Sequence, residues 1–183
     1  KDVLHLTKVE IIFIGNLLVV GALAGFFLGG RMVDRLGTKY VFLCCHFGFA
    51  TILFLFLWRA LFPGEVQIIV GILTFLFGMV QAASSIAMTS ETLVLIPVEN
   101  KSLATGLWFT LYSGGTGLSG VLSGQALELG LLSDSWTWLG QHMSRYDGLL
   151  LFCVTMVLLM TVTLGPIPSY IKKTPAGWIP HNQ

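Results

Sequence analysis

Long apolar stretches alternate with short polar segments along this chain. The first stretch, IIFIGNLLVVGALAGFFL over residues 11–28, contains no ionisable side chain. As a helix, a run of this length can cross a hydrocarbon layer of about 30 Å. A buried helix of a soluble protein is the alternative for one such run, but five runs in one chain favour a membrane protein. Spans are predicted at 9–30, 40–62, 66–89, 102–126 and 148–170.

The composition agrees with this pattern. Of the 183 residues, 55% are hydrophobic and only 10% are charged, too few charges to cover the surface of a soluble domain of this size. Backbone groups in lipid must form their hydrogen bonds within the segment, so the spans should be α-helices. The sequence therefore predicts an all-α, polytopic membrane helix bundle, a single membrane domain over residues 1–183 with the lipid bilayer as its partner.

Charge and cysteine content exclude several other classes of protein. The net charge of +1 gives no reason to expect a nucleic-acid partner. Cys44, Cys45 and His46 are adjacent, and neighbouring helical residues point about 100° apart, so they cannot close one metal site. We expect no metal, no cofactor and no enzymatic activity.

The distribution of basic residues predicts an orientation. With five crossings, the connections 31–39 and 90–101 and the tail 171–183 share one side of the membrane. That side holds six basic residues and the other holds four, which favours a cytoplasmic location for the connection 31–39 and for the carboxyl-terminal tail. The six are Arg31, Arg35, Lys39, Lys101, Lys172 and Lys173.

Some spans carry glycines and polar side chains on definite faces, whereas the second and fifth are almost uniformly bulky and apolar. Glycines at four-residue spacing allow close approach of another helix. A polar stripe facing lipid is costly, so it should point into a bundle or a water-filled cavity. Helix packing is expected at Gly21, Gly25, Gly29, Gly117, Gly120 and Gly124. A polar stripe runs along the third span through Gln67, Thr74, Gln81 and Ser85.

Four side chains are candidates for lining a solute cavity between the first, third and fourth spans. They are Asn16, Gln81, Trp108 and Tyr112. Their amide, indole and phenol groups can donate hydrogen bonds or stack on a small solute. Hydrogen bonding between helices is the alternative role for each of them.

The segment GGRMVDRLGTKYVF, residues 29–42, concentrates charge between two spans. Each charge would cost roughly 2.5–3.5 kcal/mol in hydrocarbon, so we expect a loop at the membrane surface. Gly37 suits a tight turn with positive φ. A short basic hairpin would explain the arginines and the lysine, but it leaves the acid Asp34 unexplained.

The segment resembles the cytoplasmic loop motif of the major facilitator superfamily, G-x-x-x-D-R-x-G-[RK]-[RK]. Gly30, Asp34, Arg35, Gly37 and Lys39 match the motif. Thr38 departs from it, because a basic residue is usual at that position. This resemblance implies a secondary transporter of twelve helices in two halves, which moves a small solute by alternating access. It also implies that Asp34 acts as a latch against a helix amino terminus of the other half, with Arg35 and Lys39 as pairing cations.

Comparison with the family pattern also favours one half of the transporter. The third span lacks the arginine common in the family's fourth helix, and the fourth span lacks the Gly-Pro pair of proton antiporters. The chain is therefore expected to contain helices eight to twelve, with the remaining half as a partner.

Two other functions are open from the sequence. Gly117-Leu118-Ser119-Gly120 resembles the G-x-S-G motif of rhomboid intramembrane proteases. Only His142 and His181 follow it, and both are predicted to lie outside the membrane. A membrane scaffold without transport activity is the second alternative.

Overall fold

The computed structural model describes residues 6–58, 66–96, 100–133, 135–138, 140–165, 171–174 and 177–180. Five helices account for most of this part of the chain. They are α1 (Lys8–Leu36), α2 (Thr38–Leu57), α3 (Val66–Leu95), α4 (Lys101–Glu128) and α5 (Arg145–Leu164). The predicted fold class, an all-α membrane bundle with about five helices, is thus confirmed. Residues 59–62 and 166–170, which were expected inside the second and fifth spans, lie outside the described residues.

The charged segment departs from the expectation. It was predicted as a loop over 31–39, but α1 continues through Leu36 and α2 begins at Thr38. Helix α1 has 29 residues, so it is about 43 Å long and exceeds a hydrocarbon layer of about 30 Å. Its last turns can therefore carry charge outside the layer without leaving the helix.

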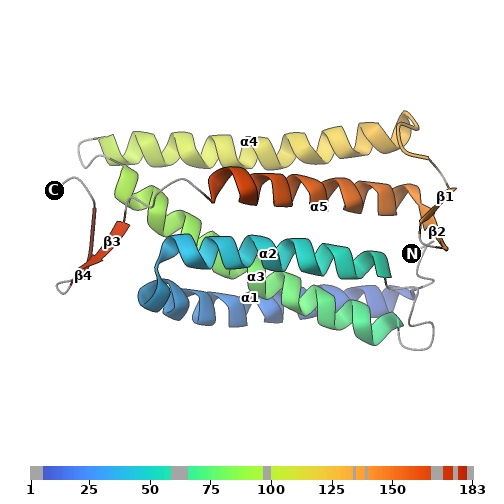
Figure 1. Cartoon of the computed structure of the whole chain (residues 1–183), viewed down its shortest axis with the longest axis horizontal. Helices are drawn as coiled ribbons and strands as arrows, with labels where there is room; N and C mark the ends of the chain where they lie inside the picture. The colour runs from blue at the N-terminus through green and yellow to red at the C-terminus, as the bar shows by residue number, and fades with distance from the viewer. Residues whose placement is uncertain are drawn as a thin grey trace.

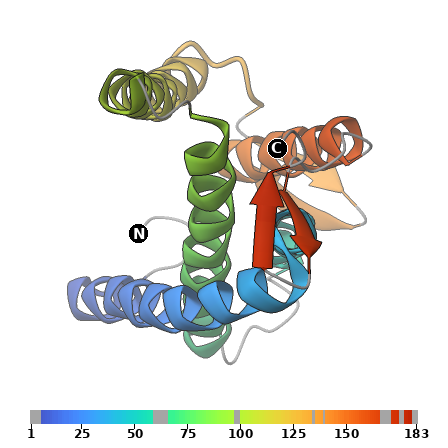
Figure 2. The ribbon, with the colours of Figure 1, turned by 90° about the vertical axis from the view of Figure 1, so that its left-hand side faces the viewer.

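The helices form a bundle in which α3 is central. Helix α1 packs mainly against α3, and α2 lies between α3 and α5. Helix α4 runs alongside α5 in Figure 1, but Figure 2 shows that it stands away from the other helices. None of its residues is buried. The packed part of the bundle is therefore made by α1, α2, α3 and α5.

Length and hydropathy suit these four helices to a membrane. Within the described residues, α1, α2, α3 and α5 are long and apolar enough to cross one. Large apolar side chains such as Leu23, Phe27 and Val162 are 65–71% exposed, as lipid contact requires. Helix α4 is long enough, but its glycine, serine and threonine residues make it less apolar. The chain is an integral, multi-pass membrane protein.

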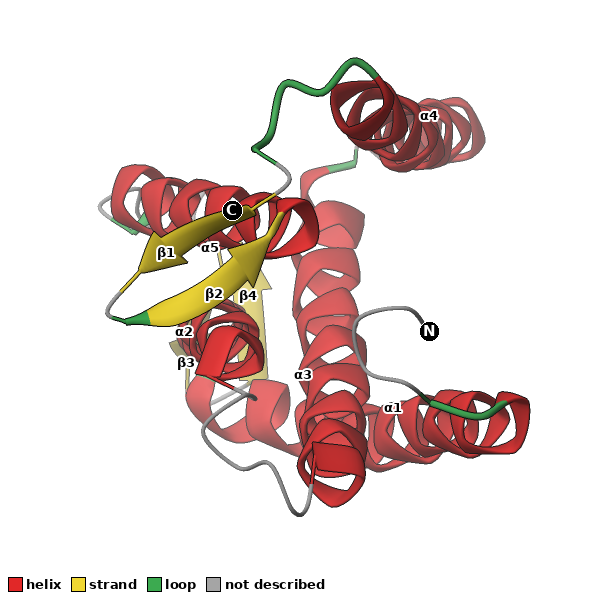
Figure 3. Cartoon of the chain, turned by 90° about the vertical axis from the view of Figure 1, so that its right-hand side faces the viewer, coloured by secondary structure: helices red, strands yellow, loops and turns green. Residues whose placement is uncertain are grey.

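Two short antiparallel hairpins lie at opposite ends of the bundle, in segments expected to lack regular structure (Figure 3). One pairs β1 (Ser135–Trp138) with β2 (Gln141–Ser144), and the other pairs β3 (Ile171–Thr174) with β4 (Gly177–Pro180). Asp147 is only 2% exposed and accepts hydrogen bonds from the N–H and hydroxyl of Ser144, at 2.9 and 2.8 Å. These bonds fix the first turn of α5 to β2.

An aromatic cluster joins the β1–β2 hairpin to the end of α2. The rings of Trp58 and Trp138 lie 6.4 Å apart, and Phe54 lies 6.3 Å from Trp138. The indole N–H of Trp136 donates to the Ser144 carbonyl at 3.2 Å. Indoles with an apolar face and one polar N–H are favoured at a membrane–water interface.

The junction of α1 and α2, the start of α4 and the β3–β4 hairpin all lie at one end of the bundle, on the left in Figure 1. The amino terminus of α1 and the β1–β2 hairpin lie at the other end. The charged motif and the carboxyl-terminal hairpin therefore share one side.

Candidate functional site

The junction between α1 and α2 is the best-defined polar site of the bundle. Gly37 is the only residue between the two helices, and its φ of 92° is strained for any residue with a Cβ atom. Its N–H donates to the Val33 carbonyl at 2.9 Å, which closes the end of α1. The glycine of the motif therefore makes the reversal between two helices possible within one residue.

Small apolar side chains pack beneath this junction. They form a buried cluster from three helices: Val33, Val41, Cys45, Ala83 and Ala87. Val41 is fully buried and Ala87 is 1% exposed. The cluster packs the last turn of α1 and the first turns of α2 against α3. The backbone that carries the motif is therefore fixed by a buried apolar contact.

Thr38, the residue that departs from the family motif, connects the junction to α3. Its side chain is 6% exposed, and its hydroxyl donates a hydrogen bond to the carboxylate of Glu91. Thr38 thus holds Glu91 through a neutral donor at a position where the motif usually has a cation. Sequence analysis did not pair these residues, because 53 positions separate them.

The charged motif residues lie on the outer side of the same junction. Asp34 and Arg35 are exposed, whereas Lys39 is half-buried. Asp34, Lys39 and Glu91 each interact with other groups of the chain. Gly30 lies one turn earlier, where an added Cβ would meet only the end of Ile86, at 4.0 Å. The motif therefore has a buried, anchored side and an exposed, charged side.

Glycines make the contact between α1 and α3. A Cβ atom at Gly21 would collide with the backbone of Phe75, and one at Gly25 with the backbone of Met79. At Gly29 the collision would be with the Cα of Ala83, at 2.6 Å. Each step along α1 matches a step of one turn along α3, so the two helices run parallel in close contact. Gly78 of α3 faces the backbone of Leu18 in the same way.

The glycines of α4 have no such neighbour. A Cβ atom added at Gly117, Gly120 or Gly124 would meet no other described atom within 4 Å. Among the described helices, none therefore lies against the face that was expected to pack closely.

Of the four candidate cavity residues, the structure brings two, Trp108 and Tyr112, into contact. Trp108 and Tyr112 stack on each other along α4, with ring centroids 5.6 Å apart and planes inclined by 15°. Asn16 is exposed on α1 and Gln81 is exposed on α3. Within the described part of the chain, neither makes a hydrogen bond to another side chain.

The residues considered for other chemistry make local contacts. The hydroxyl of Ser119 donates to the Thr116 carbonyl at 2.8 Å, within its own helix. Nδ1 of His46 lies 2.8 Å from the Phe42 carbonyl oxygen, also within one helix. These contacts give no support to an activated serine or to a metal centre.

The fold and the junction define a class, that of polytopic helical membrane proteins with a charged glycine motif at the reversal between two successive spans. A sequence model of the Major Facilitator Superfamily matches residues 1–179. No curated protein and no solved structure matches the chain. The chain therefore belongs to the Major Facilitator Superfamily, whose members are secondary transporters, and the resemblance seen in residues 30–39 is confirmed.

Proposed function

We propose that this chain is part of a transporter that carries a small solute across a membrane by alternating access. The observation that carries the proposal is that the motif has two sides. Thr38 is buried and donates a hydrogen bond to Glu91, whereas Asp34 is exposed at the end of α1. An exposed carboxylate there can meet a helix amino terminus of a second half, where the aligned peptide dipoles stabilise it by roughly 0.3–1 kcal/mol. Such a contact can form in one state and break in the other.

A second half of the transporter is inferred from the exposure of α4. This helix buries none of its residues, and its glycine face has no neighbour among the described helices. Transporters of this kind rock one bundle of helices against another around a central site. We infer that further helices cover α4, and that the present helices correspond to helices eight to twelve of a twelve-helix protein. Asn16, Gln81, Trp108 and Tyr112 then face the solute path.

The motif end is proposed to face the cytoplasm. The positive-inside rule supports this orientation, since six basic residues lie on the side of the motif and four on the other. Cysteines introduced at Arg35 and Ser135, at opposite ends of the bundle, test it with a membrane-impermeant maleimide. In intact cells we expect labelling at Ser135→Cys alone, and labelling at Arg35→Cys would reverse the orientation.

Transport is tested in proteoliposomes that contain the complete transporter, with a panel of radiolabelled solutes. For any solute that accumulates, we expect Asp34→Asn to lower the transport rate while solute binding is retained. Glu128→Gln, which removes an exposed acid from the last turn of α4, is the matched control. Equal rates for the two variants would contradict a latch role for Asp34.

A further inference from the structure

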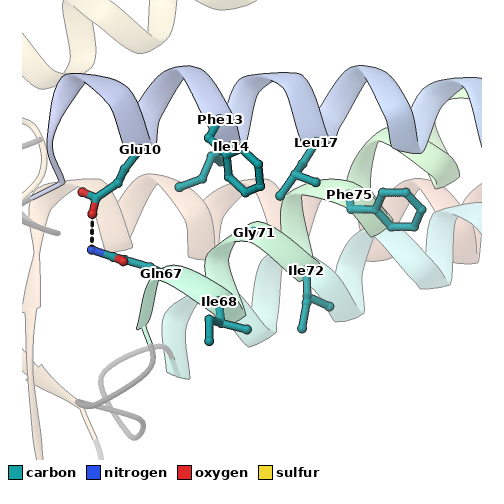
Figure 4. A pocket seen from close by; sticks show the side chains of 9 residues that line it. All are labelled: Glu10, Phe13, Ile14, Leu17, Gln67, Ile68, Gly71, Ile72 and Phe75. Atoms are coloured by element: carbon teal, nitrogen blue, oxygen red, sulfur yellow. Dashed lines mark hydrogen bonds between the residues drawn. The ribbon is translucent and has the colours of Figure 1, made fainter.

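A cavity lies between α1 and α3 at the end opposite the motif (Figure 4). Its volume is about 390 Å³, within the range of roughly 300–1,000 Å³ that is typical of small-molecule sites. None of the four proposed solute-path residues lines it. The cavity is thus separate from the proposed solute path.

One end of the cavity carries a fixed carboxylate. Oε1 of Glu10 accepts a hydrogen bond from Nε2 of Gln67 at 2.6 Å, and Oε2 accepts one from the Thr7 N–H at 2.7 Å. Within the described residues, these hydrogen-bond donors are neutral. The carboxylate is therefore oriented by its neighbours, and its negative charge is not cancelled by a hydrogen-bonded cation.

The rest of the cavity wall is apolar. Phe13, Ile14 and Leu17 come from α1, and Ile68, Ile72 and Phe75 come from α3. Figure 4 shows Glu10 and Gln67 together at one end, with Phe75 at the other. Gly71 leaves the space between the two helices open, because a Cβ atom there would lie 3.1 Å from Cδ1 of Leu17.

We propose that this cavity binds a monovalent organic cation with an apolar body. The cationic centre lies at Glu10, and the hydrocarbon or aromatic groups lie along the apolar walls toward Phe75. The carboxylate attracts a cation and repels an anion, whereas a neutral apolar ligand gains nothing from it. Aromatic walls add an attraction for cations, because the face of a phenyl ring is electronegative.

The charge of the ligand is tested with two ions of nearly identical shape. The complete transporter is purified in mild detergent, and equilibrium dialysis measures binding of tetraphenylphosphonium and of tetraphenylborate. Protein-free micelles supply the correction for partition into detergent. We expect saturable binding of the phosphonium ion only. Equal saturable binding of both ions, or of neither, would overturn the proposal.

Glu10→Gln tests the carboxylate without removing the helix cap, because glutamine can replace glutamate at the third position of a capping box. We expect its affinity for tetraphenylphosphonium to fall about tenfold, as the loss of one charge–charge contact near a protein surface implies. Glu128→Gln is the matched control and should bind like the unaltered chain. Ile68→Trp, at a residue that is 59% exposed, should fill the cavity and weaken binding. Unchanged affinity in both Glu10→Gln and Ile68→Trp would place the bound cation elsewhere.

Discussion

The hydroxyl of Thr38 donates a hydrogen bond to the carboxylate of Glu91 and joins the first turn of α2 to the last turns of α3. Thr38 is buried and Glu91 is half-buried, so this bond is partly shielded from water. It lies beside the buried cluster around Val41 and directly after Gly37. The motif is thereby connected to α3, the helix that also packs along α1.

Thr38→Val removes the hydroxyl and preserves the side-chain shape. We expect the free energy of unfolding to fall by about 1–2 kcal/mol, because a partly buried hydrogen bond to a charged acceptor is lost. The measurement is reversible unfolding of the purified chain in mixed detergent micelles. Thr51→Val is the control, since its hydroxyl donates to the Phe47 carbonyl of its own helix. An equally large loss in both variants would show that the Thr38–Glu91 bond contributes nothing specific.

Gly25→Ala should separate α1 from α3. The new methyl group would collide with the Met79 backbone, and overpacking of this kind costs about 1–3 kcal/mol. Gly15→Ala is the matched control in the same helix, because no described atom lies within 4 Å of its added Cβ. It should be neutral or stabilising by up to about 1 kcal/mol, since alanine favours helix more than glycine does. Thermal unfolding in detergent distinguishes the two, and equal stability would contradict the close packing.

Asp147→Ala should loosen the start of α5 and its connection to β2. The two hydrogen bonds from Ser144 are lost, and we expect unfolding to become easier by about 1–3 kcal/mol. Asp147→Asn should lose less stability, because both bonds end on one carboxylate oxygen and an amide oxygen can still accept them there. Glu128→Ala, at an exposed acid, should change stability little. If Asp147→Ala and Glu128→Ala have the same free energy of unfolding, the buried acid does not stabilise the connection between β2 and α5.

Accessibility to water-soluble thiol reagents tests the proposed solute path. In the complete transporter, with Cys44, Cys45 and Cys153 replaced by alanine, single cysteines are placed at Asn16, Gln81, Trp108 and Tyr112. We expect modification at these positions, because a solute path must contain water. A cysteine at Val162, on the exposed apolar face of α5, should be protected by lipid. Protection at all four positions would contradict the path.

Much of the site could be read from local patterns. The repeated spacing of Gly21, Gly25 and Gly29 predicted one face of α1 for close packing, and the structure places all three against α3. A similar helical spacing of glycines on α4 gives a face that no described helix covers, because the spacing of small residues does not specify which helix will approach it. The Thr38–Glu91 bond and the Glu10–Gln67 contact had no local signal, since each joins residues more than 50 positions apart.

The charged motif shows why the boundary of a span is not the end of a helix. Hydropathy places Arg31, Asp34 and Arg35 outside the hydrocarbon, but it does not say whether they are helical. Backbone hydrogen bonds continue α1 to Leu36, and only Gly37 leaves the helical conformation. The cost of a charge in lipid limits its depth, whereas the fold of its backbone depends on turn geometry and on packing beneath it.

The sequence by itself determined the membrane class, the helical secondary structure and the family motif, because apolar run length and residue spacing act locally along the chain. Only the tertiary structure decided which helix packs against which, what Thr38 and Glu10 bind, and that α4 buries none of its side chains. These outcomes depend on contacts between distant segments, and such contacts form only when the helices meet in space.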